Sequence, residues 1–292
     1  MSAPSDRHVL FATYSQQPDL TADDRLLAAA LKRRGVDVRA APWDALTDWR
    51  AAAVIVRSTW DYYLRRREFL DWTNEIAAHT ALYNTPAVIR WNSHKAYLAE
   101  LAERGIPVID TVFAAAGVRV DLANVASAHG WDDVVIKPAV SAAAYETRRF
   151  RTTERRAAQA HLDRLLVMGD VMMQPHLSAL GERGELSVMF IRGAFTHAVR
   201  RRSALIDEGA MPISAPADAT SAAVRFGERA LSLTPGAAGS DTPPLYARVD
   251  LAELADGDFQ LLELELIEPS LFFVHAPKAA ERMAEAIIEV LS

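Results

Sequence analysis

Three carboxylates near the C-terminal end of the chain have a spacing that suits a metal site. Glu263 and Glu265 alternate with leucines, so in a strand both glutamates lie on one face. Asp250 lies in a preceding strand-like run, and the turn dipeptide Asp256-Gly257 predicts a hairpin that brings Asp250 near the pair. Clustered carboxylates repel one another unless a cation lies among them, and hard oxygen ligands suit Mg²⁺. The alternative is a solvated sheet face that carries ordinary acids.

Positive charge comes mainly from arginine, and the few lysines are candidates for phosphate contact. They are Lys32, Lys95, Lys137 and Lys278. Phosphate sites often use a compact ammonium group, although a coding bias alone would also leave a few lysines. Other candidate charges on expected strands are Glu185, Arg200, Arg202 and Arg248. On a strand Arg200 and Arg202 share a face, away from Arg201. Such cations and carboxylates together suit a triphosphate held through Mg²⁺.

A polar and aromatic stretch, residues 57–63, follows the third expected strand, where open α/β sheets usually bind ligands. Arg57 is suited to pair with a carboxylate, and Ser58 and Asp61 are suited to orient an amine, with the neighbouring rings as walls. We therefore expect Arg57, Ser58 and Asp61 to bind substrate. The alternative is an ordinary loop in which Ser58 or Asp61 caps the next helix.

The elements that must position these residues begin with a small open α/β lobe. Strands are expected at 8–14, 36–41, 52–56 and 81–83, and helices at 19–34 and 68–78. No GxGxxG follows the first strand, which argues against a dinucleotide fold of the dehydrogenase type.

Beyond residue 88 the pattern changes to strands joined by hairpins and loops. A strand over 133–136 ends in Lys137-Pro138 and is followed by a loop of small residues, 139–147. A second hairpin is expected from 185–191 and 194–199, a mobile loop over 204–221, and an amphipathic helix over 277–291.

Composition excludes several function classes. The chain has 292 residues, half of them hydrophobic, and a net charge of −6, which argues against a general nucleic-acid surface. It has no cysteine, and it lacks the GxSxG, HExxH and Walker-type sequences. No secretion signal or membrane span is recognisable, so a cytoplasmic protein without nucleic-acid or membrane partners is expected.

The order of the motifs resembles the ATP-grasp superfamily, from about residue 84 to residue 275. The matching segments are Asn-Thr-Pro at 84–86, Lys95, Val-Ile-Lys-Pro at 135–138, Met-Gln-Pro at 173–175, Gly-Glu-Leu-Ser at 184–187, Arg-Val-Asp at 248–250 and Leu-Leu-Glu-Leu-Glu at 261–265. The resemblance implies an α/β fold of α+β lobes. These are a Rossmann-like N-terminal lobe (1–88), a small central lid lobe (89–172) and a C-terminal antiparallel-sheet lobe (173–292).

The resemblance also implies roles for single residues. It assigns ATP to Lys95, Lys137, Gln174, Glu185, Arg200 and Arg202, one or two Mg²⁺ ions to Asp250, Glu263 and Glu265, and stabilisation of the transition state to Arg248. Two departures matter. Glu265 stands where the D-alanine ligases have an asparagine, and the loop 139–147 is rich in alanine where the superfamily usually has glycine.

The segments at 57–62, 174–177 and 263–270 look most like the branch that contains the O-ureido-serine cyclo-ligase of cycloserine biosynthesis. That branch implies activation of a small amino-acid-like substrate as an acylphosphate, followed by ring closure. The alternatives are an intermolecular ligase that makes a dipeptide or amide, and a nucleotide-binding protein without catalysis. The family also makes a homodimer plausible.

Overall fold

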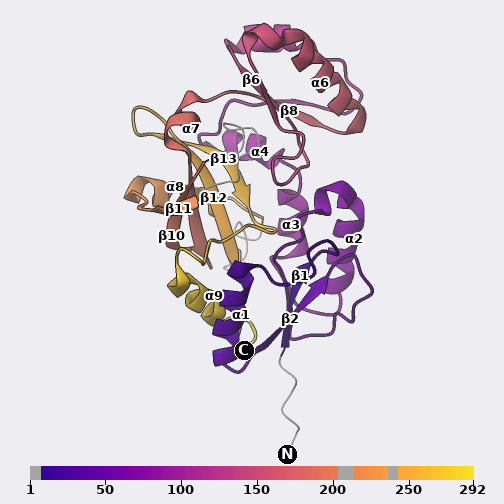
Figure 1. The fold of residues 1–292 in the computed structure, drawn as a ribbon, viewed down its shortest axis with the longest axis vertical. Coiled ribbons are helices and arrows are strands. Elements are labelled where there is room, and N and C mark those ends of the chain that lie inside the picture. The colour runs from indigo at the N-terminus through magenta and orange to yellow at the C-terminus, as the bar shows by residue number, and fades with distance from the viewer. Residues whose placement is uncertain (1–7, 203–213, 236–242) are drawn as a thin grey trace, which may run out of the picture.

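The computed structural model describes residues 8–202, 214–235 and 243–292, which form three sheets with flanking helices. In Figure 1 the small sheet with α6 lies at the top, the N-terminal lobe at the lower right, and the largest sheet between and beside them. Within the described residues, no helix is both long and apolar enough to cross a membrane.

The N-terminal lobe is a parallel sheet in the order β2-β1-β3-β4. Its elements are β1 (His8–Thr13), α1 (Ala22–Arg33), β2 (Asp37–Pro42), β3 (Ala53–Val56), the 3-10 helix η1 (Tyr62–Arg65), α2 (Arg66–Ala77) and β4 (Leu82–Tyr83). Alternate residues of β1 and β3 pack towards α1 on one face and α2 on the other. Because both faces are covered, the two strands are continuous apolar runs. The expected open α/β lobe is confirmed.

Helix α1 shows how the sequence defines an element. Thr21 caps its first turn by accepting a hydrogen bond from the Asp24 amide at 3.1 Å. Acidic residues lie in the first turn and Lys32 and Arg33 in the last, in agreement with the helix dipole. Gly35, at φ +78°, then takes the left-handed conformation that ends the helix.

The small sheet has the order β5-β8-β6-β7 and carries two helices. Its elements are β5 (Val112–Ala114), α5 (Leu122–His129), β6 (Val134–Pro138), β7 (Arg148–Phe150), the 3-10 helix η2 (Thr152–Glu154), α6 (Arg155–Met168) and β8 (Val171–Pro175). Two short helices, α3 (Pro86–Asn92) and α4 (Tyr97–Glu103), connect it to the first lobe. A separate apolar core lies between this sheet and α5 and α6.

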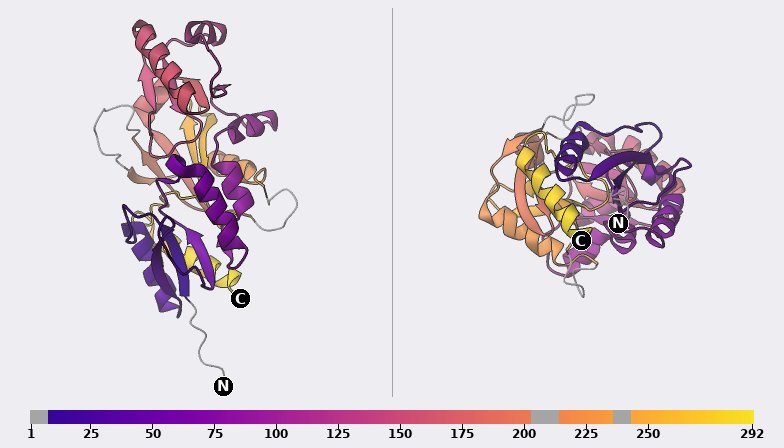
Figure 2. Two further views of the ribbon diagram at one scale, coloured as in Figure 1. Left: turned by 90° about the vertical axis from the view of Figure 1, so that its right-hand side faces the viewer. Right: turned by 90° about the horizontal axis from the view of Figure 1, so that it is seen from below.

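The largest sheet is antiparallel, in the order β11-β10-β9-β12-β13. Its elements are α7 (Ser178–Arg183), β9 (Glu185–Ile191), β10 (Ala194–Arg201), β11 (Ser214–Ala217), α8 (Ser221–Leu231), β12 (Tyr246–Glu253), β13 (Phe259–Glu265) and α9 (Pro277–Val290). Helix α9 packs beside α1 of the first lobe, as Figure 1 and the right view of Figure 2 show.

Two elements differ from the expected loop over 204–221. Residues 203–213 lie outside the described residues, but Ser214–Ala217 pairs with β10 and α8 begins at Ser221. The hydroxyl of Thr220 caps α8 by accepting from the Ala223 amide at 3.2 Å. Three of the four buried residues of α8 are small, namely Ala223, Gly227 and Ala230, beside Leu231, so the apolar periodicity of this helix is weak in the sequence.

Candidate functional site

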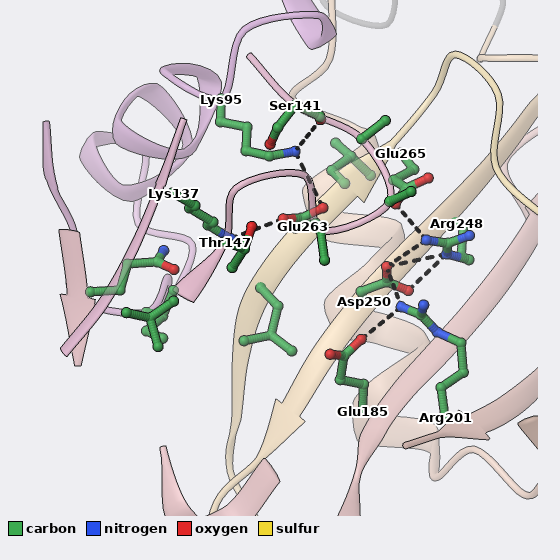
Figure 3. A pocket seen from close by; sticks show the side chains of 18 of the residues that line it. Lys95, Lys137, Ser141, Thr147, Glu185, Arg201, Arg248, Asp250, Glu263 and Glu265 are labelled. Atoms are coloured by element: carbon green, nitrogen blue, oxygen red, sulfur yellow. Dashed lines mark hydrogen bonds and ion pairs between the residues drawn. The ribbon is translucent and has the colours of Figure 1, made fainter. Parts of the chain in front are cut away.

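A cavity of about 460 Å³ lies where the small sheet, the largest sheet and the loop after β3 meet. Five basic and five acidic residues of the described chain line it: Lys95, Lys137, Arg201, Arg202 and Arg248, and Glu185, Asp250, Glu263, Glu265 and Glu268. Figure 3 shows most of these side chains turned towards one another. The formal charges of the ten residues cancel, so cations that accompany a polyanion such as a triphosphate would favour its binding here.

The floor of the cavity is the hairpin of β12 and β13. Arg248 lies opposite Glu265 and Asp250 opposite Glu263, with a bulge directly after Asp250. The sequence predicted this hairpin, and the register confirms that Asp250 lies beside the glutamates. Residues two apart share a face, so the four side chains all project into the cavity.

Arg248 and Asp250 form a buried ion pair on this floor. Nε of Arg248 donates to Oδ1 of Asp250 at 2.9 Å, and Nη2 donates to Oδ2 at the same distance. Nη2 of Arg248 also donates to Glu265. Burial opposes ionisation of Asp250, but the guanidinium groups of Arg201 and Arg248 outweigh it and lower the pKa of Asp250.

Arg201 joins this pair to β9. Its Nη2 lies 2.8 Å from Oδ2 of Asp250 and 2.7 Å from Oε2 of Glu185, and its Nε donates to Ser187 Oγ at 2.8 Å. Burial raises the pKa of Glu185, and the neighbouring Arg201 counteracts only part of that effect.

Two ammonium groups hold the remaining predicted metal ligand. Nζ of Lys137 lies 2.9 Å from Oε1 of Glu263, and Nζ of Lys95 lies 3.3 Å from Oε2. Burial opposes ionisation of Glu263, but these two lysines outweigh it and hold its pKa well below the usual value. For Glu265 the balance is reversed, because burial and the neighbouring carboxylates raise its pKa more than Arg248 lowers it.

No three histidine or acidic side chains in residues 8–202, 214–235 and 243–292 are grouped as a metal site. Asp250, Glu263 and Glu265 are each turned to basic partners. The donor chemistry nevertheless fits Mg²⁺, because Asp250 and Glu263 oppose each other across the hairpin and carry hard oxygens. Binding of cations there requires the lysines and arginines to move to other partners, and the metal assignment stays a prediction.

The far end of the cavity is lined by Gln174 and the segment after β8. Nε2 of Gln174 donates to Thr111 Oγ1 at 2.9 Å. Pro175, His176 and Leu177 continue the lining, and Leu180 of α7 completes it. A polar amide beside apolar side chains suits a flat heterocycle, which agrees with the predicted adenine contact.

The loop 139–147 covers the cavity, and its backbone is unusual. Ala143, Ala144 and Glu146 all have left-handed φ values, of 48°, 56° and 52°. Tyr145 packs its ring against Tyr63 of the first lobe at 4.9 Å between centroids. The loop therefore takes conformations that favour glycine, although the sequence places alanine there.

The structure places Arg57, Ser58 and Asp61 outside the cavity lining. Arg57 is 2% exposed, and its Nε donates to Oδ1 of Asp24 at 2.7 Å. Asp61 accepts from Trp43 Nε1 at 2.9 Å and from Arg65 at 2.7 Å. The side chains of Arg57 and Ser58 are buried in the lobe and that of Asp61 is held by Trp43 and Arg65, so the substrate role of these three residues stays a prediction. The rings of Trp60 and Tyr62 line the cavity in their place.

The predicted common face of Arg200 and Arg202 is also absent. Strand β10 ends at Arg201, so the alternation does not continue to Arg202. Arg201 and Arg202 line the cavity, whereas Arg200 pairs with Glu253 at 2.7 Å outside it. Sequence periodicity therefore missed Arg201. The three consecutive arginines at the end of a strand were the available signal, because at a strand end the alternation does not determine which of them faces the cavity.

Known proteins with similar sequences or structures support the resemblance. The sequence-family model of the D-cycloserine synthetase DcsG N-terminal domain matches residues 9–84. The cycloserine biosynthesis protein DcsG of Streptomyces lavendulae is 32% identical over 281 residues, which are 91% of this chain and 92% of the relative. The chain belongs to the DcsG family of ATP-grasp ligases.

Solved structures extend this result. The crystal structure of D-cycloserine synthetase DcsG has a TM-score of 0.89 and 29% identity, and the match covers 98% of this chain and 100% of that one. The ATP-grasp ligase PsnB, solved with its minimal precursor, Mg and ADP, scores 0.67 at 19% identity and covers 100% and 99%. D-alanine–D-alanine ligase from Bacillus anthracis scores 0.70 at 10% identity and covers 98% and 97%. The last two show the fold alone. The predicted ATP-grasp fold is confirmed.

Proposed function

We propose that this member of the DcsG family is an ATP- and Mg²⁺-dependent ligase that closes a ring in a small ureido-amino acid. The observation that carries the proposal is the hairpin floor, which presents Arg248, Asp250, Glu263 and Glu265 to one cavity. Lys95 and Lys137 reach the same floor from α4's N-terminal side and from β6. The full-length similarity to DcsG supports the substrate class.

Residues of the central and C-terminal lobes divide the binding of ATP in this proposal. Gln174 and the segment after it hold the adenine, and Glu185 holds the ribose. Lys95, Lys137 and Arg202 hold phosphate oxygens, and Arg201 joins them although the sequence favoured Arg200. The lobes are proposed at 1–88, 89–172 and 173–292, so that the cavity lies between all three.

Asp250, Glu263 and Glu265 would hold Mg²⁺, which when bound neutralises phosphate charge. Lys95 and Lys137 would then exchange Glu263 for phosphate oxygens, which is consistent with their present position on either side of that carboxylate. The cancelled charge of the cavity supports this arrangement, because the ligand brings both anion and cation.

The reaction proceeds in two steps. An oxygen of the substrate carboxylate attacks the γ-phosphorus of ATP, the bond from that phosphorus to the β-phosphate oxygen breaks, and ADP leaves. A nitrogen of the same molecule then attacks the acyl carbon, the bond to the phosphate oxygen breaks, and the released phosphate takes up the proton that the nitrogen loses. Arg248 holds the reacting carboxylate and the charge that develops on it. The loop 139–147 excludes water, which would otherwise hydrolyse the acylphosphate.

The test is release of ADP with a panel of amino acids and ureido-amino acids, with the products identified by mass. We expect ADP and a cyclic product from a ureido-amino acid alone. A product that contains a second amino acid would identify an intermolecular ligase. If no compound released ADP, the protein would be a nucleotide-binding protein without catalysis and the proposal would be wrong.

A further inference from the structure

Glu268 is a buried carboxylate in the cavity wall that the proposed chemistry leaves without a task. It follows β13, is 7% exposed and lines the cavity together with Trp60, Tyr62 and Ser270. In the part of the chain that the structure describes, no other residue forms a hydrogen bond or an ion pair with its carboxyl group.

The other acidic residues of the lining differ from it in this respect. Glu263 has two lysines, and Glu185, Asp250 and Glu265 each have at least one arginine. Glu268 therefore stands apart as the cavity carboxylate without a basic partner among the described residues.

Burial of a carboxylate without a counter-ion is unfavourable. Burial raises the pKa of Glu268 well above the usual value, the charge of Glu265 adds to this, and Lys95 and Arg248 offset only part of it. A buried carboxyl group with a raised pKa in a cavity wall is a candidate for a functional residue.

The backbone around Glu268 is held firmly. Trp60 Nε1 donates to the Glu268 carbonyl at 3.1 Å, and Arg248 Nη1 donates to the Ser270 carbonyl at 3.3 Å. The loop after β3 thus fixes the segment from one side and the cavity floor fixes it from the other. The carboxyl group is placed by these contacts and not by a side-chain partner.

We propose that Glu268 binds the α-ammonium group of the amino-acid substrate. The inference rests on the proposed function and extends it, because it assigns the part of the substrate that takes no part in ring closure. An ammonium group supplies the positive charge that Glu268 lacks, and the rings of Trp60 and Tyr62 favour a cation beside them. The neighbouring Arg248 holds the substrate carboxylate beside the phosphate site in the proposed function. The ammonium group and the carboxylate of an α-amino acid would therefore each have a partner of opposite charge.

A further metal ligand is the less favoured role. Mg²⁺ needs several oxygens in an octahedral arrangement, and the described residues do not group three acids at this point. An ammonium group needs one carboxylate and tolerates aromatic neighbours, which matches this part of the cavity.

The test compares the ureido-amino acid with its deaminated analogue, in which hydrogen replaces the ammonium group. Binding is measured by calorimetry in the presence of Mg²⁺ and a non-hydrolysable ATP analogue, so the result does not require turnover. Deamination should weaken binding to the unmodified protein about 10- to 100-fold. The substitution Glu268→Gln should weaken binding of the amino acid to a similar degree, so that the variant binds both compounds nearly equally. It should leave the affinity for the ATP analogue unchanged.

Glu228→Gln on the exposed face of α8 is the matched control, and it should discriminate between the two compounds as the unmodified protein does. The inference is overturned if Glu268→Gln, folded by its melting temperature, still prefers the amino acid as strongly. It is also overturned if the unmodified protein binds both compounds equally. Absence of ADP release together with normal discrimination would refute the proposed function while it supports the role of Glu268.

Discussion

Arg201 Nη2 lies 2.8 Å from Asp250 Oδ2, and this contact ties the end of β10 to the centre of the cavity floor. Its neighbour Arg200 points away and pairs with Glu253. Arg201→Gln should therefore lower kcat/KM about 100-fold or more, whereas Arg200→Gln should change it by less than about threefold. Steady-state release of ADP measures both. Equal losses in the two variants, or a larger loss for Arg200→Gln, would contradict the placement.

This pair also shows what the sequence could and could not predict. The hairpin of Asp250 and Glu263 was predictable, because alternation and a turn dipeptide are local signals. Which of Arg200 and Arg201 faces the cavity was not predictable, because it depends on where β10 ends. The pairing of Arg57 with Asp24 was not predictable either, since the two residues come from different elements and only the folded sheet brings them together.

Glu263 separates the ammonium groups of Lys95 and Lys137, so its removal leaves two like charges close together in the cavity. Glu263→Gln should abolish more than about 99% of the activity and destabilise the fold by about 3 to 5 kcal/mol. Urea unfolding and ADP release are the measurements. Full activity in this variant would rule out Glu263 as a metal ligand.

Arg57 and Asp24 form an ion pair in which both side chains are 1% exposed, and its loss is expected to act on stability. Arg57→Met should destabilise the fold by about 3 to 5 kcal/mol, because Asp24 is left buried without a counter-ion. The double variant Asp24→Asn/Arg57→Met should recover part of that loss, which a double-mutant cycle in urea detects. A large rise in the KM for the amino acid with unchanged stability would instead support the substrate role that the sequence predicted.

Ala144 takes a left-handed conformation at an exposed position of the loop over the cavity. Ala144→Gly should stabilise the fold by about 0.5 to 1 kcal/mol, since glycine removes the backbone strain but adds freedom to the unfolded chain. Ala160→Gly, at an exposed position within α6, is the control and should destabilise by about 1 kcal/mol. Thermal unfolding distinguishes the two. A loss of stability in both variants would mean that the loop is not strained at Ala144.

Glu268 makes stability depend on pH in a direction that can be derived from its surroundings. Burial first, and then the charge of Glu265, raise the pKa of Glu268 in the folded protein, while Lys95 and Arg248 lower it. Tyr62 also faces Glu268, and its own pKa is raised by burial and then by the charge of Glu268. A carboxyl whose pKa is raised on folding contributes stability below its unfolded pKa and loses it as pH rises through the folded value. Glu268→Gln, which carries no charge at any pH, should therefore match the unmodified protein near pH 4 and become the more stable of the two at neutral pH. Urea unfolding of both proteins across this range measures the difference, and Glu228→Gln should show none. A Glu268→Gln variant that is less stable at neutral pH would show that the carboxylate is paired in the folded protein.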